Sequence, residues 1–434
     1  MGAGIRCITI VHPADEIAEY RTISAFLRLF GIFVCERLEG MPDGDETDAR
    51  VVLGKEASPK TIAAILDRLE VFVGKAVISV LKKAEKIYTS NDLMRGCYAI
   101  EFFATARDPV IHEDMLDSYD RFSDSLDQFR KLEGELAEED QLSLKYILAA
   151  QANCMRRMNQ LYNTLWDAAE RGWYRGAGGS DALKKKLLSR TYYFNTMMNP
   201  LIEKILKIDP NYYGAYSIKA LNDMIDEDEK ADSIVSFRTA VSMIGNKSYS
   251  SYLRYRMGRY YEYILRDSDE SLKNYAKSYE VDQNNYRAIY KLAARAQRQE
   301  EYETAIKYLD MILSILGKKK KSCALQPIEC AYLFKAYKNK GKIYLKQKKY
   351  QACIAEMQQA VDVYNSQANM DPDKGFYSLM FGKKKAEYKE AARRNMQIWK
   401  VYEIMTDAAV GANQYDDYKK YLFLADEFRK KDQK

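Results

Sequence analysis

The chain has 434 residues, of which 47% are hydrophobic and 30% charged, with only 8 Pro and 21 Gly. This composition is typical of a folded, mostly helical protein and argues against a disordered chain or an all-β fold. The net charge of +6, from 68 basic and 62 acidic residues, does not by itself indicate nucleic-acid binding. With only two His, a His-rich metal cage or a His-dependent triad is not expected, and no apolar run is long enough to cross a bilayer.

The first hundred residues alternate strand and helix patterns. Apolar, β-branched runs at Ile5–Pro13 and Ile32–Glu39 predict strands, and a helix pattern that ends at a glycine separates them. A third strand is expected at Ala49–Gly54, followed by a helix at Ser58–Phe72 that opens with an N-cap serine and a proline. This β-α-β order predicts a small α/β domain with a parallel sheet over residues 1–106.

The strand, helix, glycine, strand pattern is similar to the Toll/interleukin-receptor (TIR) fold, a flavodoxin-like arrangement, and to receiver domains. The segment after the second strand, "GIFVCERLEGMPDGDE", resembles a TIR strand that leads to an acidic Pro/Gly loop. The segment "MRGCYAIEFF" resembles the TIR helix that carries an NAD-cleaving glutamate, which would make Glu101 the candidate catalytic residue. The bland alternative is that Glu101 is surface charge on an amphipathic helix. A receiver would need an Asp at the end of the third strand, and "ARVVLG" has none.

Helix patterns fill the middle of the chain. Residues 113–207 are predicted to be helical throughout, with a turn at the glycine-rich segment Gly176–Ser180. We interpret residues 107–207 either as a connector between domains or as degenerate helical repeats.

The C-terminal half contains a repeated pattern of small, aromatic and large residues. Its clearest copy has the positions Gly341, Tyr344, Tyr350, Cys353, Met357 and Ala360. Small residues let two antiparallel helices approach closely, and the larger residues fill the space between them. The pattern resembles the tetratricopeptide repeat (TPR), whose period is about 34 residues. Equivalent positions on the second helix recur at Ser233, Ser271, Ala305 and Cys353, which are 38, 34 and 48 residues apart.

The long last step is interpreted as a loop insertion at Leu316–Cys330, with the lysine run of "GKKKKS" at its solvated tip. The segment Lys385–Lys431 is expected to add a helix pair that caps the array. The sequence therefore predicts a mostly α fold: an α-solenoid of tetratricopeptide-like hairpins over residues 208–434, preceded by the small α/β domain.

The resemblance implies that the first helix of each hairpin lines a concave surface. Carrying the repeat frame along the chain places basic and Tyr residues at the inward positions of copies two to four, and no acidic residue. The predicted partner-binding residues are Tyr252, Tyr255, Arg259, Tyr263, Arg287, Tyr290, Arg298, Lys335, Lys338, Lys342 and Lys346. The first copy has Gly214, Ser217, Leu221 and Ile225 there and lacks this character.

These features favour a protein-interaction adaptor, scaffold or sensor subunit that holds an acidic protein segment in a basic, Tyr-rich groove. Such domain pairs fit a bacterial (antiviral) defence or signalling complex, by analogy only. Two alternatives stay open: a TIR-like NAD-cleaving effector regulated by the array, and a repeat protein that binds nucleic acid by charge and stacking. A further alternative is a basic face that is exposed to solvent and binds no partner. No cofactor, metal or membrane partner is expected, and with no secretory leader and no CxxC pair among seven Cys we expect a cytoplasmic protein.

Overall fold

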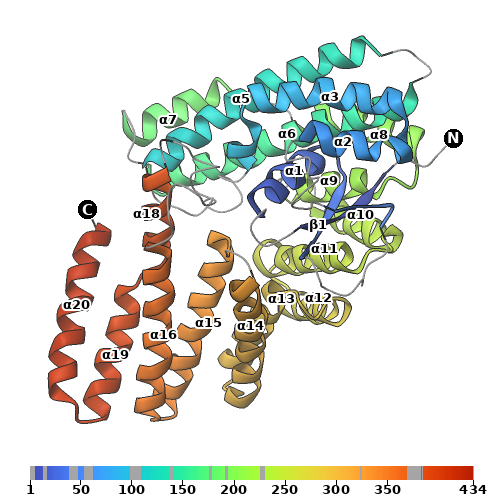
Figure 1. Cartoon of the computed structure of the whole chain (residues 1–434). Helices are drawn as coiled ribbons and strands as arrows, with labels where there is room; N and C mark the ends of the chain where they lie inside the picture. The colour runs from blue at the N-terminus through green and yellow to red at the C-terminus, as the bar shows by residue number, and fades with distance from the viewer. Residues whose placement is uncertain are drawn as a thin grey trace. The chain divides into compact units, whose positions relative to one another are not determined.

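The computed structural model describes residues 5–12, 17–38, 47–52, 62–97, 109–136, 140–174, 178–190, 194–224, 230–322, 325–368, 383 and 385–433 (Figure 1). The chain divides into two compact units, Met1–Ser271 and Leu272–Lys434, and the division falls inside helix α12 (Ser268–Val281). The predicted domain boundaries at residues 106 and 207 both lie within the first unit, so the three-part division stays a prediction.

A three-stranded parallel sheet lies in the first unit, as predicted. Its strands are β1 (Cys7–His12), β2 (Phe33–Leu38) and β3 (Ala49–Val52), in the order β2-β1-β3. Helix α1 (Ile17–Leu29) connects β1 to β2, which confirms the predicted β-α-β unit. The side chains of β1 are buried along its whole length, as expected for the central strand of a sheet covered on both faces.

The other elements described in the N-terminal and middle segments are helices, as predicted. The helices are α2 (Ile62–Val73), α3 (Lys75–Ser90), α5 (Pro109–Gly134), α6 (Gln141–Glu170), α7 (Gly179–Leu188) and α8 (Phe194–Ile208). Helix α6 packs against α1, α3, α5, α7, α8 and α9, so it is the central helix of this unit. The break predicted at the glycine-rich segment is real, because Gly178 adopts a left-handed φ of 78° just before α7.

Four consecutive helix hairpins follow, at the positions that the repeat pattern predicts. The first two are α9 (Tyr213–Asp223) with α10 (Lys230–Met243), and α11 (Lys247–Tyr260), extended by the π-helical turn η2 (Tyr261–Leu265), before α12. The next two are α13 (Tyr286–Arg298) with α14 (Tyr302–Ser322), and α15 (Pro327–Lys346) with α16 (Tyr350–Ala368). The fold is therefore mostly helical, with tetratricopeptide-like hairpins after a small α/β segment.

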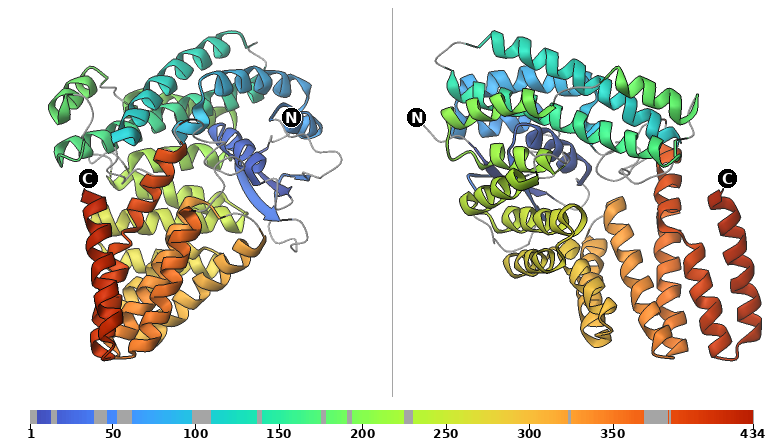
Figure 2. Two further views of the ribbon diagram at one scale, coloured as in Figure 1. Left: turned by 60° about the vertical axis from the view of Figure 1, so that its left-hand side comes forward. Right: turned by 180° about the vertical axis from the view of Figure 1, so that it is seen from behind.

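Two local predictions were wrong. The segment Leu316–Cys330 is not a loop insertion, because α14 continues to Ser322 and α15 begins at Pro327. The extra residues lengthen the two helices instead, since lysines are good helix formers and Lys319 of α14 pairs with Glu329 of α15 at 2.8 Å. The C-terminal segment is not a single pair either: α18 (Lys385–Met396) precedes a fifth hairpin of α19 (Trp399–Gly411) and α20 (Tyr415–Gln433), side by side with α15 and α16 (Figure 2).

In the first unit the sheet packs on the first helices of hairpins one and two. The ring of Phe33 in β2 stacks on Tyr249 of α11 with centroids 4.0 Å apart, and Asn246 donates a hydrogen bond to the sulfur of Cys35. The Tyr249 hydroxyl in turn donates to Ser217 of α9 at 2.6 Å. The surface that the resemblance assigns to a partner is thus covered here by the chain's own N-terminal segment.

Two residues at the start of α6 bond to the segment before β1 and to the turn before α9. The Tyr146 hydroxyl accepts from the amide of Ile5 at 2.7 Å and donates to its carbonyl at 2.8 Å, which satisfies the backbone just before β1. Lys145, only 1% exposed, forms an ion pair with Asp209 in the turn between α8 and α9 at 2.9 Å. The α/β segment and the hairpins of this unit therefore share one continuous, hydrogen-bonded interior.

Candidate partner-binding surface

The candidate surface lies in the second unit, where the first helices α13, α15 and α19 are neighbours. Three lysines of α15, Lys335, Lys338 and Lys342, are three to four residues apart and so lie on one side of the helix. The charge of Lys400, on α19, acts on Lys338 together with the charges of Lys342 and Lys335, so Lys400 lies within electrostatic range of Lys338. These four residues are named the lysine cluster below.

Lys338 is the centre of the lysine cluster. Burial, followed by the charges of Lys342, Lys400 and Lys335, lowers the pKa of Lys338 to about 8. Its ammonium lies 5.3 Å from the ring centroid of Phe334. In the described part of the chain, no carboxylate pairs with Lys338, Lys342 or Lys400. Three of the four charges of the cluster are therefore not neutralised by any carboxylate among the described residues.

A lysine on the opposite side of α15 is, in contrast, paired with two carboxylates. Lys340 is held between Asp310 of α14 at 2.9 Å and Glu356 of α16 at 2.8 Å, and these two carboxylates raise its pKa above the usual value despite burial. Lys338, two residues earlier in the same helix, has neither partner. The contrast indicates that Lys338 is not part of the ion-pair network that joins the described helices.

Tyrosines border the lysine cluster on α13 and α15. Tyr332 packs edge-on against Tyr286 and Tyr290 with centroids 5.2 and 5.3 Å apart, and the Tyr290 hydroxyl accepts a hydrogen bond from Asn339 at 3.1 Å. The Lys335 ammonium lies 5.4 Å from the Tyr332 ring, within cation–π distance. These contacts fix the three tyrosine rings beside Lys335.

Five of the predicted partner-binding residues lie at this surface: Tyr290, Lys335, Lys338, Lys342 and Arg287, whose guanidinium lies 5.9 Å from the Tyr286 ring centroid. The repeat frame missed Lys400 and Tyr286. Lys400 could have been predicted from the sequence, because extending the repeat frame by one hairpin makes α19 a first helix.

Two further predicted residues lie at the other end of these helices. Arg298 and Lys346 are the last residues of α13 and α15, and both are exposed. Lys346 lies 4.0 Å from Glu300 and over the ring of Tyr302, so its charge has a neighbour of opposite sign. Their role in binding stays a prediction.

The predicted residues of copy two lie in the first unit. Tyr255 is only 4% exposed and belongs to the core, so it cannot present a contact surface, and its assignment was wrong. Arg259 lies over the ring of Tyr263, which is 45% exposed in the π-helical turn. Tyr252 is partly buried beside Arg256. The four residues therefore do not form one exposed stripe.

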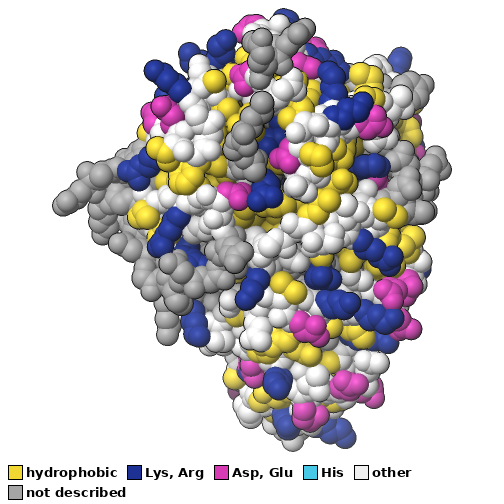
Figure 3. Space-filling view, turned by 90° about the vertical axis from the view of Figure 1, so that its right-hand side faces the viewer, with side chains coloured by type: hydrophobic (Ala, Val, Ile, Leu, Met, Phe, Trp, Pro, Cys, Tyr) yellow, Lys and Arg dark blue, Asp and Glu magenta, His cyan; other side chains and the backbone are white. Residues whose placement is uncertain are grey.

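Other expectations depend on parts of the chain outside the described residues. Glu101 lies there, so the candidate catalytic residue stays a prediction. Within the described ranges, no cluster of His, Cys, Asp and Glu is suited to hold a metal ion, and none of the helices is long and apolar enough to span a membrane. On the face shown in Figure 3, basic, acidic and apolar side chains are interspersed, so the net positive charge is not gathered there.

No protein-family model matches the chain, and no curated protein is similar in sequence. Several solved structures are similar in part. They include the APC/C hetero-tetramer Cut9–Hcn1 (TM-score 0.29, 14% identity, 83% of this chain and 59% of that chain). A second is aspartyl phosphate phosphatase F from Bacillus subtilis (TM-score 0.31, 13% identity, 78% of this chain and 93% of that chain). A third is yeast Tom70 (TM-score 0.35, 12% identity, 86% of this chain and 78% of that chain). The chain thus spans less than two thirds of the length of the first of these.

Proposed function

We propose that this chain is a protein-interaction scaffold that binds an acidic protein segment at the lysine cluster. The observation that carries the proposal is the set of four neighbouring ammonium groups, three of them without a carboxylate partner in the described structure. Like charges held together in a partly desolvated place raise the free energy of the unbound protein. An acidic ligand supplies the missing opposite charge, so part of its binding energy comes from relieving this repulsion.

The surroundings suit an extended peptide rather than a single ion. Tyr286 and Tyr290 are partly exposed and provide apolar contact area beside the charges, and the buried Tyr332 packs against their rings. The helices that carry these groups are packed in hairpins, so little conformational entropy is lost when a partner binds.

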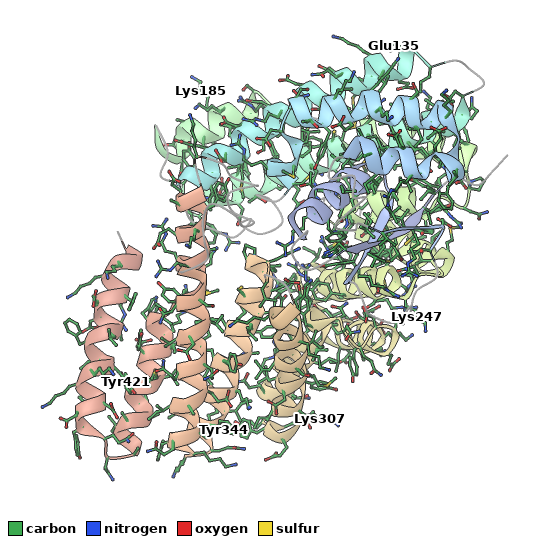
Figure 4. The ribbon with its side chains drawn as sticks, viewed as in Figure 1. Glu135, Lys185, Lys247, Lys307, Tyr344 and Tyr421 are labelled. Carbon is green, nitrogen blue, oxygen red and sulfur yellow. The ribbon has the colours of Figure 1, made fainter. Side chains whose placement is uncertain are left out.

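A charge-reversal experiment tests the proposal. In wild-type protein, a fluorescent glutamate-rich peptide should bind at low ionic strength, as measured by anisotropy. The K338E/K342E variant should bind it about tenfold more weakly or worse, because two attractive charges become repulsive. The matched control is Lys307→Glu on the second helix α14, labelled in Figure 4, which should leave the affinity within about twofold.

Equal affinity of the wild type and K338E/K342E for the peptide would refute the proposal. A single-stranded oligonucleotide serves as the competing ligand. If it binds more tightly than the peptide, with an affinity that falls steeply with salt, the nucleic-acid alternative replaces the peptide.

The pH dependence of peptide binding gives a second prediction. Lys338 has a pKa of about 8 in the free protein, and an anionic ligand favours its protonated form. Affinity should therefore be constant below pH 8 and fall as the pH rises from 8 to 9, by about tenfold per pH unit at most. Lys338→Arg keeps its charge over this range and should remove the pH dependence. An identical decline in wild type and variant would show that Lys338 is not the group that titrates.

A further inference from the structure

One side of helix α20 carries exposed apolar side chains. Tyr415 is 68% exposed, Leu422 is 41% exposed and Phe423 is 67% exposed. Leu422 and Phe423 follow Tyr415 by seven and eight positions, so the three side chains lie on one side of the helix. Single apolar residues are common on protein surfaces, but three that are aligned along one helix are typical of a contact with another protein.

The other side of α20 packs against α19, its neighbour at the edge of the second unit (Figure 1). Tyr421 is buried there, and the ring of Phe428 stacks on Tyr402 of α19 with centroids 5.7 Å apart. Arg429 of α20 also bonds to Glu403 of α19. These contacts fix the rotation of α20 about its own axis, so the exposed apolar side chains point away from α19.

Charged residues continue the same side of α20 in a symmetric order. The exposed residues at this helical spacing, named the α20 stripe below, are Tyr415, Lys419, Leu422, Phe423, Asp426 and Lys430. Lys419 and Asp426 are equally far from the midpoint between Leu422 and Phe423. Tyr415 and Lys430, at the two ends, are also equally far from it. The stripe therefore has a centre, about which a basic position corresponds to an acidic one.

This order makes the α20 stripe complementary to itself in one orientation only. When two copies of α20 pack antiparallel about a two-fold axis at the midpoint, Lys419 of each copy faces Asp426 of the other, and Leu422 faces Phe423. Tyr415 then lies opposite Lys430, a pair that can form a cation–π contact. A parallel pair would instead place Lys419 against Lys419 and Asp426 against Asp426. The helix dipoles also favour the antiparallel pair.

The Asp426 carboxylate can take part in such a contact. It lies 3.5 Å from Arg429 on the next turn of α20, and its side chain is 53% exposed. Arg429 also bonds to Glu403, so its charge is shared between two carboxylates. An exposed ion pair within one helix contributes little to stability, so the fold does not depend on the contact between Asp426 and Arg429.

We propose that the α20 stripe binds a second copy of this chain, with the two α20 helices antiparallel in a two-fold symmetric dimer. Charge complementarity favours this occupant, because each end of the stripe matches the other end of the same stripe. The stripe covers about 22 Å of helix at about 1.5 Å per residue, which gives a small interface. Small interfaces belong to weak complexes, so we expect a dissociation constant in about the micromolar range.

Sedimentation equilibrium of the full chain tests for the dimer. With rising protein concentration, the mass of wild type should increase from 50.2 kDa toward twice that value. Phe423→Glu should weaken the association at least about tenfold, because it places a charge against apolar side chains. The control is Val235→Glu on α10, where the valine is 62% exposed, and it should leave the association within about twofold of wild type.

A charge exchange tests the orientation of the two helices. The single variants K419E and D426K should each weaken the dimer at least about threefold at low ionic strength, because each places like charges opposite one another. The double variant K419E/D426K should return to within about twofold of wild type, since opposite charges face each other again. In a parallel pair the double variant would still place like charges together. Far-ultraviolet circular dichroism of each variant checks that α20 remains helical.

A wild type that stays monomeric up to about 0.1 mM would overturn the proposal and leave the α20 stripe to a partner of another sequence. A dimer that Phe423→Glu does not weaken, or a double variant as weak as the single ones, would overturn it too. The result is separable from the proposed function, because K338E/K342E should dimerise like wild type and Phe423→Glu should keep the peptide affinity.

Discussion

Replacing Asp209 with asparagine should lower the free energy of unfolding of the first unit by about 3–5 kcal/mol, the range for breaking a buried ion pair by removing one partner. The substitution preserves the shape of the side chain and removes only its charge. Lys145 is then left 1% exposed with its ammonium 2.9 Å from a neutral amide. The rings of Tyr146 and Tyr212 lie 5.1 and 4.7 Å away and compensate only part of the charge.

Urea unfolding at neutral pH, followed by near-ultraviolet circular dichroism, measures this loss. The matched control is Asp167→Asn, because Asp167 pairs with Arg171 on the surface and both are more than half exposed. That change should cost about 0.5 kcal/mol or less. The double variant K145M/D209N should recover at least half of the loss, since an apolar pair needs no charge compensation. A loss below about 1 kcal/mol for Asp209→Asn would show that the ion pair contributes little.

The loss should also depend on pH. Burial lowers the pKa of Lys145 in the folded protein, and removal of Asp209 takes away the hydrogen bond and charge that oppose this effect. A lysine with a lowered folded pKa gains stability as the pH rises from that value toward the unfolded value of 10.5. The difference between wild type and Asp209→Asn should therefore shrink at high pH.

Replacing Gly214 with alanine should destabilise the first unit by about 2–3 kcal/mol, the upper part of the usual range of about 1–3 kcal/mol for overpacking. A Cβ atom at this position would lie 2.6 Å from the backbone carbonyl oxygen of Gly31 and 3.2 Å from the ring of Tyr212. Gly31 has a φ of +75° in the turn between α1 and β2, and the Tyr212 hydroxyl donates to the neighbouring carbonyl of Phe30. A backbone atom cannot move aside cheaply, so the helix and the turn must separate.

The control for this variant uses a helical glycine with open space around it. Gly317 in α14 has no atom within 4 Å of an added Cβ, so Gly317→Ala should stabilise the protein by about 0.5–1 kcal/mol through helix propensity alone. The two glycine-to-alanine changes are thus expected to have opposite signs in the same urea experiment. Stabilisation by Gly214→Ala would contradict the close approach of α9 to the turn after α1.

The hairpins could be predicted because their determinants are local in sequence. Gly341 and Met357 are sixteen residues apart, and a Cβ at Gly341 would lie 2.5 Å from the end of the Met357 side chain, so a neighbour within the same repeat favours the small residue. The strands β1 to β3 were likewise predicted from short β-branched runs. Helix ends were harder: the lysine run after Gly317 suggested a loop, yet its own helix propensity and the bond of Lys319 to Glu329 continue the helix.

The sequence by itself determined the hairpins, the parallel sheet and the basic face of α15, because each depends on residues within one or two turns or one repeat. Only the tertiary structure decided which faces remain available to a partner. Phe33 covers Tyr249 across more than two hundred residues, and Lys400 joins Lys338 from another hairpin. Contacts between residues so far apart in sequence depend on the free energy of packing whole helices and strands, which a local residue pattern does not predict.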